Sequence, residues 1–396
     1  MNVNDVQHSR RFREEDSMMN SNSLKKTGVV ILSFTCTGTE LNRQLCEKLR
    51  KIIQPDAGAD ACIGYAPEKY AGEGILPLPA DKAALIGSRW GQSAYVFIGA
   101  AGIAVRYIAP SVKDKYTDSP VLVIDEKGQY VIPLLSGHMG GAAALADEVA
   151  DMIGAVPVHT TATDVQGKFA VDVFAKKNGL VITDREAVKK ISAGLLNGEK
   201  AALYIEDSSV SITGTPPEEI ILCESLEEAE QYSYRIMIAG GSERYVQSRH
   251  SEVQEPEREG CTLVLLSRNI TAGIGCRKGI EEAALEKGFL EILAANGLDI
   301  RQVKSIASID LKKDEPALLY LCGKYHIPFK TYTAEELSSI SGVTAASDFV
   351  KKITGVDNVC ERAARLSCVS GSLIQGKCIR EEMTAALVKC PLEITF

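Results

Sequence analysis

The sequence predicts an α/β protein of several domains, with mostly parallel, three-layer sheets in its N- and C-terminal domains and a smaller α/β region between them. Three observations support this class. Continuous apolar runs rich in β-branched residues, such as Gly28–Phe34, have the pattern of strands buried on both faces. Segments with apolar residues at helical spacing alternate with these runs. The length of 396 residues is that of two to three domains.

The chain divides into four predicted parts. Arg10 and Arg11 imitate the start of an export signal, but such a signal needs an apolar region after them and none follows. Residues 1–26 are therefore expected to form a disordered tail. An N-terminal domain is expected over 27–165, and a middle region with a polar linker over 166–258. A C-terminal domain is expected to open at Cys261 and to cover 261–396.

Strands and helices alternate along both outer domains. In the N-terminal domain the strands expected after the first are Ala94–Ile98, Val121–Asp125, Tyr130–Leu135 and Pro157–Thr161, with a turn at Lys127-Gly128 joining two of them. In the C-terminal domain the expected strands are Thr262–Leu266, Ile270–Gly275, Ser305–Asp310, Pro328–Tyr332 and Thr384–Lys389. Its expected helices include Ile280–Ala295, Glu315–Tyr325 and Val359–Leu366.

Composition excludes several classes of function. The chain has 44 basic and 52 acidic side chains, and its net charge of −8 argues against general nucleic-acid binding while leaving room for a local basic pocket. No stretch approaches the roughly 20 apolar residues of a membrane helix. The 11 cysteines show neither a CxxC pair nor zinc-finger spacing. We therefore expect a cytoplasmic protein with reduced thiols in its cores and no metal site of its own.

The sharpest local signal is Ser136-Gly137-His138-Met139-Gly140-Gly141. Glycines on both sides of a histidine let the backbone approach a ligand closely, and the helix that follows offers free N–H groups to an oxyanion. His138 could act there as a general base or acid. The segment follows a strand, and open α/β sheets bind ligands at the carboxyl edge of their strands. A histidine that only caps a tight turn is the alternative.

Hydroxyl and carboxylate side chains follow the next expected strand. Thr161 and Asp164 would lie on the same sheet edge as His138, where they could bind a polar substrate or orient a base. Helix capping or turn stabilisation explains them equally well. His159 lies within the strand itself and is expected to be an ordinary core or surface histidine.

Basic side chains near two glycine-rich turns could pair with substrate carboxylates. The turn from Gly99 to Gly102 precedes Arg106, Lys113 and Lys115, although a solvated loop would also explain these cations. In the C-terminal part, Gly273 and Gly275 precede Arg277 and Lys278 in a segment that looks like an anion-binding turn at a helix start. It matches neither the P-loop nor the Rossmann fingerprint. Asp310, at a strand end, is either a base or a cap.

These motifs together resemble the CbiG family. GAAGIAVRYIAP (99–110), VKDKYTD (112–118), VIPLLSGHMGG (131–141) and PVHTTATDVQG (157–167) are similar to its N-terminal half. GIGCRKG (273–279), SIASIDLKKDE (305–315), SDFVKKITGVDNVCERAA (347–364) and residues 373–377 are similar to its C-terminal domain. The resemblance covers residues 28–396, with the motifs in the same order.

The resemblance implies a cobalt-precorrin-5A hydrolase of anaerobic vitamin B12 synthesis. Such an enzyme opens the ring A δ-lactone of the macrocycle and releases the C20 carbon with its methyl group as acetaldehyde, giving cobalt-precorrin-5B. The cobalt belongs to the substrate, so no cofactor is expected. Partners would be the substrate and, transiently, neighbouring enzymes of the pathway, with no nucleic acid and no membrane.

The chemistry implied by the resemblance assigns a role to each candidate residue. His138 would be the base or acid, the Gly140 and Gly141 N–H groups would lie near the oxyanion, and Thr161 and Asp164 would orient water or substrate. The remaining candidates would bind the substrate and its carboxylates: Gly99, Gly102, Arg106, Lys113, Lys115, Gly273, Gly275, Arg277, Lys278 and Asp310.

Two departures from the family pattern matter. Ala143 stands where the family usually has asparagine, and His159 stands where it usually has an aliphatic residue, so neither is expected to be catalytic. A non-catalytic tetrapyrrole carrier or chaperone is the main alternative function, and acetaldehyde release would distinguish the two. A methyltransferase of the same pathway is a third alternative, but the chain lacks a convincing adenosylmethionine loop.

Overall fold

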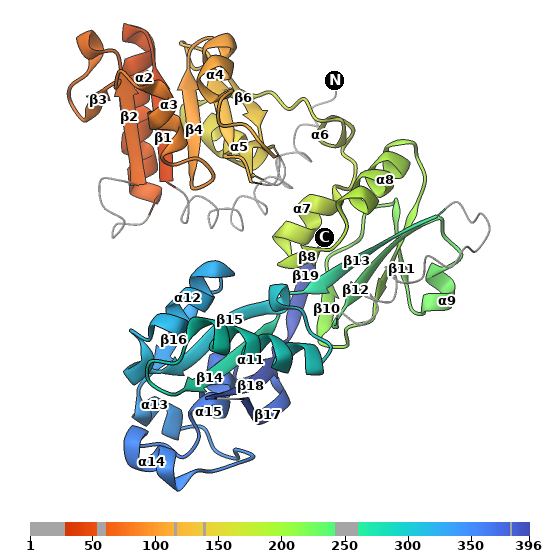
Figure 1. Cartoon of the computed structure of the whole chain (residues 1–396). Helices are drawn as coiled ribbons and strands as arrows, with labels where there is room; N and C mark the ends of the chain where they lie inside the picture. Colours follow the sequence, from red (N-terminus) through yellow and green to blue (C-terminus); the bar gives the residue numbers. More distant parts are fainter. Residues whose placement is uncertain (1–27, 54–60, 115–116, 138–139, 242–259, 381) are drawn as a thin grey trace. The chain divides into compact units, whose positions relative to one another are not determined.

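The computed structural model describes residues 28–53, 61–114, 117–137, 140–241, 260–380 and 382–396, without the side chains of Asp164 and Phe349. The expected tail over 1–26 and most of the expected linker lie outside these residues. The chain folds as two compact units, the first ending at Lys168 and the second beginning at Phe169 (Figure 1). Each unit is described by itself below.

The first unit is a seven-stranded sheet in the order β3-β2-β1-β4-β5-β6-β7. Its strands are β1 (Gly28–Ser33), β2 (Cys62–Ala66), β3 (Ile75–Pro77), β4 (Ser93–Ile98), β5 (Val121–Ile124), β6 (Tyr130–Leu135) and β7 (Val156–Pro157). Its helices are α2 (Cys36–Ile52), α3 (Lys82–Gly87), α4 (Ala101–Ile108), α5 (Ala142–Ile153) and α6 (Ala162–Gln166).

Side chains that alternate along the central strands build two cores, one on each face of this sheet. On one face, Val96 packs in a cluster with Leu45 of α2 and Val149 of α5. On the other face, Phe97 packs in a cluster with Ala104 of α4. All strand pairs are parallel except β5–β6. Sheet and covering helices form three layers, as the sequence predicts for this class of fold.

The second unit holds two five-stranded sheets and one two-stranded sheet. The middle sheet has the order β11-β9-β12-β13-β8, and its strands are β8 (Leu180–Ile182), β9 (Ala201–Ile205), β11 (Ile220–Cys223), β12 (Tyr234–Ala239) and β13 (Cys261–Ser267). Helices α7 (Val171–Lys177) and α8 (Arg185–Leu196) pack on one face, while α9 (Leu226–Ala229) covers residues of the other.

Two strands near domain boundaries differ from the expectation. The strand expected over Thr262–Leu266 was assigned to the C-terminal domain, but the observed β13 pairs with β12 and β8 and completes the middle sheet. At the end of the chain, β19 (Leu392–Thr395) pairs with β10 (Val210–Thr213), so the C-terminus returns to the middle region. The sequence did not predict these pairings, because they join strands that are far apart along the chain.

The C-terminal sheet has the order β16-β15-β14-β18-β17 and is parallel in one half and antiparallel in the other. Its strands are β14 (Ile270–Cys276), β15 (Val303–Ile309), β16 (Phe329–Tyr332), β17 (Ser372–Arg380) and β18 (Met383–Lys389). Helices α11 (Glu282–Ala295) and α12 (Pro316–Lys324) pack on one face. Helices α13 (Ala334–Ser338) and α15 (Val359–Ser367) pack on the other, and α14 (Asp348–Thr354) lies between them in sequence.

Two observations bear on the expectations for membrane segments and for cysteines. Across the part of the chain that the structure describes, no helix combines the length and apolar character that a membrane span requires. Cys368 and Cys390 are joined as a disulfide, with their Cα atoms 6.0 Å apart, so the expectation of reduced thiols is wrong for this pair. The other nine cysteines are free.

Candidate functional site

The direction of β6 decides where the predicted site residues of the first unit lie. The parallel strands β1, β4 and β5 end at one edge of the sheet, here called the carboxyl edge. Because β6 is antiparallel to β5, with Leu135 opposite Val121, it ends at the opposite edge, where β5 begins. The expectation that the segment Ser136–Gly141 follows the carboxyl edge is therefore wrong, and we call its location the amino edge.

Gly99 and Gly102 lie at the carboxyl edge. Gly99 follows β4 with a φ of +151°, a conformation that favours glycine. Gly102 lies exposed in the first turn of α4, and its carbonyl accepts a hydrogen bond of 3.1 Å from the exposed Arg106. These two glycines and the pair Gly140-Gly141 therefore lie on opposite edges of one sheet. The two glycine-rich turns do not line one binding site together.

Lys113 belongs to the loop that leads from α4 to β5 and so to the amino edge. The buried Asp118 carboxylate holds this loop, because both its oxygens accept the Lys113 backbone N–H at 3.0 Å and one accepts the Trp90 indole N–H at 3.1 Å. The Lys113 side chain itself is exposed and available to a ligand at that edge. Lys115 lies outside the described residues.

The backbone around Ser136 is folded tightly before α5. Ser136 has a φ of +57°, which is uncommon for a residue with a side chain. A Cβ added to Gly140 would lie 2.3 Å from the Ser136 Cβ, and the Ser136 carbonyl accepts the Ala142 N–H at 3.1 Å. Only glycine fits at position 140 for this reason. His138 lies outside the described residues, so its role stays a prediction.

Thr161 lies where the chain leaves the last strand of the sheet. The strand expected over Pro157–Thr161 is wrong beyond Pro157, because β7 ends there and only the Val158 N–H continues the ladder, to Val131 at 2.9 Å. β7 is parallel to β6 and so points toward the amino edge, but it pairs only with Tyr130 and Val131 at the start of β6. The exposed Thr161 then starts α6, and Asp164 lies within that helix.

Helix α5 contributes two carboxyl groups that sequence reasoning missed. The Asp147 carboxylate lies 2.9 Å from the His159 Nε2. Burial, with a smaller contribution from the charge of Asp147, raises the pKa of Glu148 to about 7. Helical periodicity does place both residues off the most buried stripe of α5, but the partnership with His159 depends on how β7 ends.

The glycines of β14 serve packing in the second unit. A Cβ on Gly273 would lie 1.8 Å from the Cys360 carbonyl oxygen of α15, and a Cβ on Gly275 would lie 2.9 Å from the Thr384 hydroxyl. Close approach of a helix and of a side chain to the strand therefore explains both glycines without a ligand. This is a different physical reason from the anion-binding turn that the sequence suggested.

The turn after β14 binds carboxylates of its own chain. The exposed Arg277 guanidinium lies 2.7 Å from Glu382, and the Gly279 N–H donates to the buried Glu315 at 2.9 Å. Burial alone would raise the pKa of Glu315, but hydrogen bonds from Lys312 and Gly279 and the nearby charge of Lys278 hold it below its ordinary value. Helix α11 begins only at Glu282, so the turn is not a helix start.

Lys278 and Asp310 lie at the same edge of the C-terminal sheet. Asp310 opens a 3-10 turn directly after β15, and Lys278 lies in the turn after the parallel neighbour β14. The Lys278 side chain is exposed and Asp310 is partly exposed. This edge therefore offers a cation and a carboxylate to a ligand, with Arg277 already paired to Glu382.

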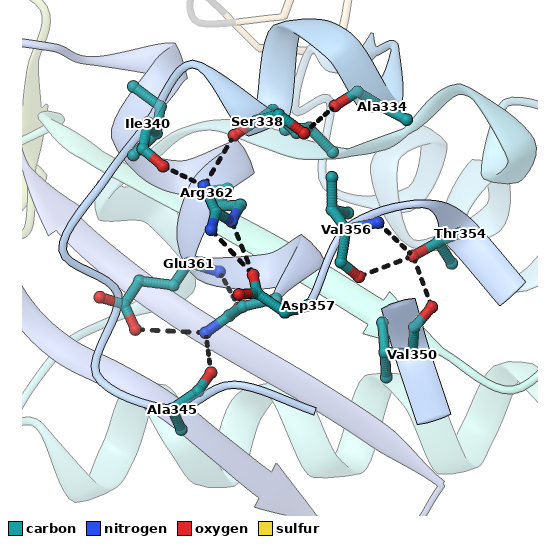
Figure 2. Close-up of polar contacts among 12 residues, drawn as sticks. Ala334, Ser338, Ile340, Ala345, Val350, Thr354, Val356, Asp357, Glu361 and Arg362 are labelled. Atoms are coloured by element: carbon teal, nitrogen blue, oxygen red, sulfur yellow. Dashed lines mark hydrogen bonds and ion pairs between the residues drawn. The ribbon is translucent and has the colours of Figure 1, made fainter. Parts of the chain in front are cut away.

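The polar side chains of the segment 347–364 hold the loop that precedes it. The fully buried Glu361 accepts hydrogen bonds from the Thr344 hydroxyl at 2.6 Å and from Arg365 at 3.1 Å. Figure 2 shows Arg362 between Asp357, at 3.0 Å, and the Ile340 carbonyl. One end of α15 thus holds residues 340–345 in place. The polar side chains of this segment therefore have a structural role.

Among the described residues, no group of three or more His, Cys, Asp or Glu side chains is placed to hold a metal ion. The geometry instead offers two sheet edges with polar groups, one in each unit. The amino edge of the first unit carries Lys113, Gly140 and Gly141, and the carboxyl edge of the C-terminal sheet carries Lys278 and Asp310. Thr161 follows β7 at the start of α6.

Comparison with known proteins follows this division of the chain. Family models for the N-terminal, central and C-terminal parts of cobalamin synthesis protein G match residues 85–164, 169–238 and 270–388. The chain is 33% identical over 364 residues to a protein from Salmonella typhimurium named cobalt-precorrin-5A hydrolase. The aligned residues make up 91% of this chain and 97% of that protein.

The chain belongs to the CbiG family. It is therefore an enzyme, a hydrolase of cobalamin biosynthesis. A second CbiG relative, from Priestia megaterium and also named cobalt-precorrin-5A hydrolase, is 37% identical over 276 residues, which are 68% of this chain and 71% of that one. A solved structure of a putative CbiG homologue from Sulfolobus solfataricus covers 92% of this chain and 99% of its own, with 22% identity and a TM-score of 0.38.

Proposed function

We propose that this chain hydrolyses cobalt-precorrin-5A, opening the ring A δ-lactone and releasing the C20 unit as acetaldehyde to give cobalt-precorrin-5B. The observation that carries the proposal is the 33% identity to a protein of that name along nearly the whole length of both chains. The cobalt enters as part of the substrate, and the protein works in the cytoplasm with transient contacts to neighbouring enzymes.

The first step is the addition of water to the lactone carbonyl. A base takes a proton from the water, and donors stabilise the oxyanion that forms on the carbonyl oxygen. We assign the base to His138 and the oxyanion donors to the backbone N–H groups of Gly140 and Gly141. Thr161 and Asp164 would orient the water or the substrate.

The second step breaks the bond between the ring and the C20 unit. When the lactone opens, its alkyl oxygen becomes a hydroxyl on the departing carbon. Loss of that proton turns the C–O bond into the carbonyl of acetaldehyde, and the electron pair of the broken C–C bond passes to the macrocycle, which then takes up a proton. The conjugated cobalt macrocycle is the electron sink, so the protein needs to supply only proton transfer and position.

Cationic side chains at the sheet edges would hold the carboxylates of the substrate. The exposed Lys113 and Lys278 are the most available, whereas Arg277 would have to exchange Glu382 for a substrate carboxylate. Arg106 and Lys115 complete the proposed set, with Asp310 and the glycines Gly99, Gly102, Gly273 and Gly275 shaping the turns. A local basic surface of this kind is compatible with the net charge of −8.

Incubation of the purified chain with cobalt-precorrin-5A, without oxygen, tests the function. We expect the mass of the macrocycle to fall by the loss of acetaldehyde and the gain of water, and a hydrazine trap to capture the acetaldehyde. A carrier or chaperone would bind the macrocycle with neither change, and that result would refute the proposal.

His138→Ala tests the assignment of the base. We expect it to abolish lactone opening while the circular dichroism spectrum stays that of the parent chain. Lys189→Gln is the matched control, because it changes an exposed side chain of the middle region, which forms a 2.7 Å ion pair with Glu186. Retained turnover in His138→Ala would remove that histidine from the mechanism.

A further inference from the structure

The side chain of His159 links the segment after β7 to helix α5. Its Nε2 lies 2.9 Å from the Asp147 carboxylate, across 12 residues of sequence. A quarter of the imidazole is exposed, compared with about half of the Asp147 side chain. The contact therefore joins a mostly buried ring to a helix that starts directly after the Ser136–Gly141 segment.

Stability alone does not explain a histidine at this position. The His159 Nδ1 is buried and has no hydrogen-bond partner among the described residues. Burial of an unpartnered polar atom is unfavourable, so an aliphatic side chain of similar size would pack there at no disadvantage. Positions that break such a local rule are expected at functional sites.

Other unpartnered atoms lie in the same stretch of chain. Five buried side-chain polar atoms lack a partner within the described ranges, and three of them belong to Ser136, Glu148 and His159. These residues come before, within and after α5. The concentration indicates that the surroundings of α5 are arranged for something other than the lowest folding free energy.

The segment that follows His159 has few buried side chains to hold it. The last ladder hydrogen bond runs from the Val158 N–H to Val131 at 2.9 Å. Thr160 and Thr161 are exposed, and Val165 of α6 is 68% exposed. The bond between His159 and Asp147 is thus a side-chain anchor to α5 immediately before the residues Thr161 and Asp164.

We propose that His159 and Asp147 are positioning residues. Their bond fixes the start of the segment 160–166 against α5 and so sets the spacing between Thr161 and the Gly140-Gly141 turn. The inference rests on the proposed function, in which Thr161 and the Gly140-Gly141 turn meet the same substrate. A displacement of about 1 Å in such a site can reduce turnover by one to two orders of magnitude.

Four variants test the proposal through acetaldehyde release from cobalt-precorrin-5A. His159→Val and Asp147→Ala should each lower kcat about tenfold, with KM within about twofold of the parent value. Their combination should cost no more than either change alone, because both remove one contact. His159→Gln, whose amide can still donate to Asp147, should recover at least a third of the parent kcat. Melting temperatures of all variants should stay close to that of the parent.

Hydrogen exchange supplies a readout that does not depend on turnover. In His159→Val the backbone amides of residues 160–166 should exchange faster than in the parent chain, while those of β4 stay unchanged. Lys189→Gln should change neither exchange nor kinetics.

Parent-like kcat in His159→Val, losses that multiply in the double variant, failure of His159→Gln to recover activity, or unchanged exchange over 160–166 would each overturn the proposal. Absence of turnover in the parent chain would instead refute the proposed function, and the exchange result would then decide the anchoring by itself.

Discussion

Glu148 on α5 carries a carboxyl group that folding shifts toward its neutral form. Burial and the charge of Asp147 raise its pKa from 4.5 to about 7. The folded chain therefore holds this proton more tightly than the unfolded chain does. The protonated Glu148 carboxyl contributes to the free energy of unfolding in full below pH 4.5, and this contribution is lost as the pH rises toward 7. For a partly solvated group the effect is about 1–2 kcal/mol.

Glu148→Gln removes this titration. We expect the variant to be more stable than the parent by about 1–2 kcal/mol at pH 8 and equal to it at pH 4, as measured by urea unfolding at both values. Asp151→Asn changes an exposed carboxylate on the same helix and should leave both values within about 0.5 kcal/mol. Equal stability of Glu148→Gln and parent at pH 8 would contradict the raised pKa.

At the scale of elements, the contact of α15 with β14 depends on the absence of a side chain at position 273. In Gly273→Ala the new Cβ would meet the Cys360 carbonyl oxygen at 1.8 Å and the Ala364 nitrogen at 2.7 Å, so the helix has to move. We expect a loss of about 3 kcal/mol in chemical unfolding. Gly323→Ala in α12, where a Cβ meets nothing within 4 Å, should instead be neutral or slightly stabilising. A parent-like Gly273→Ala would restore the case for a ligand-binding turn.

The loop held by α15 is a second test at this scale. Glu361 is fully buried, and the Thr344 and Arg365 donors outweigh burial and lower its pKa. Glu361→Ala leaves Arg365 and the Thr344 N–H without their acceptor, which should cost about 3–5 kcal/mol. Limited proteolysis should then cleave within residues 340–345 at concentrations that spare the parent chain. Resistance equal to that of the parent would show that the loop is held by other contacts.

At the scale of the molecule, a buried ion pair joins the middle sheet to the C-terminal sheet. Asp207, which follows β9, lies 2.7 Å from Lys389 at the end of β18 and accepts a hydrogen bond of 2.6 Å from Ser267 of β13. Burial opposes the charge of Asp207, but the hydrogen bonds from Lys389, Ser209 and Ser267 prevail and lower its pKa. Stability from this group is present above pH 3.8 and is lost as the pH falls through the lower folded value.

Lys389→Met leaves the Asp207 carboxylate buried without its cation. We expect a loss of about 3–5 kcal/mol at pH 7, much of it recovered by adding Asp207→Asn, with calorimetry reporting the order of the transitions. The same substitution at the exposed Lys324, paired with Glu286, should cost no more than about 1 kcal/mol. A double variant no more stable than Lys389→Met alone would refute the account.

Local patterns were sufficient for much of this protein. Most of the strands and helices that apolar runs and helical spacing predicted lie within a residue or two of the observed ones, because periodicity depends only on which faces of an element are buried. The quoted motifs led to the family for a similar reason, since they are contiguous in sequence. The short turn at Lys127-Gly128 even held the information that β5 and β6 are antiparallel, because a parallel connection needs a crossover of a dozen or more residues.

Only the tertiary structure decided which residues meet. It placed Gly99 and Gly140 on opposite edges of one sheet, assigned Gly273 to the packing of a helix from 87 positions later in the chain, and brought Asp147 to His159. It also gave β13 and β19 to the middle region. The physical reason is common to all of these results: hydrogen-bond pairing and close backbone approach join segments whose separation along the chain carries no local pattern.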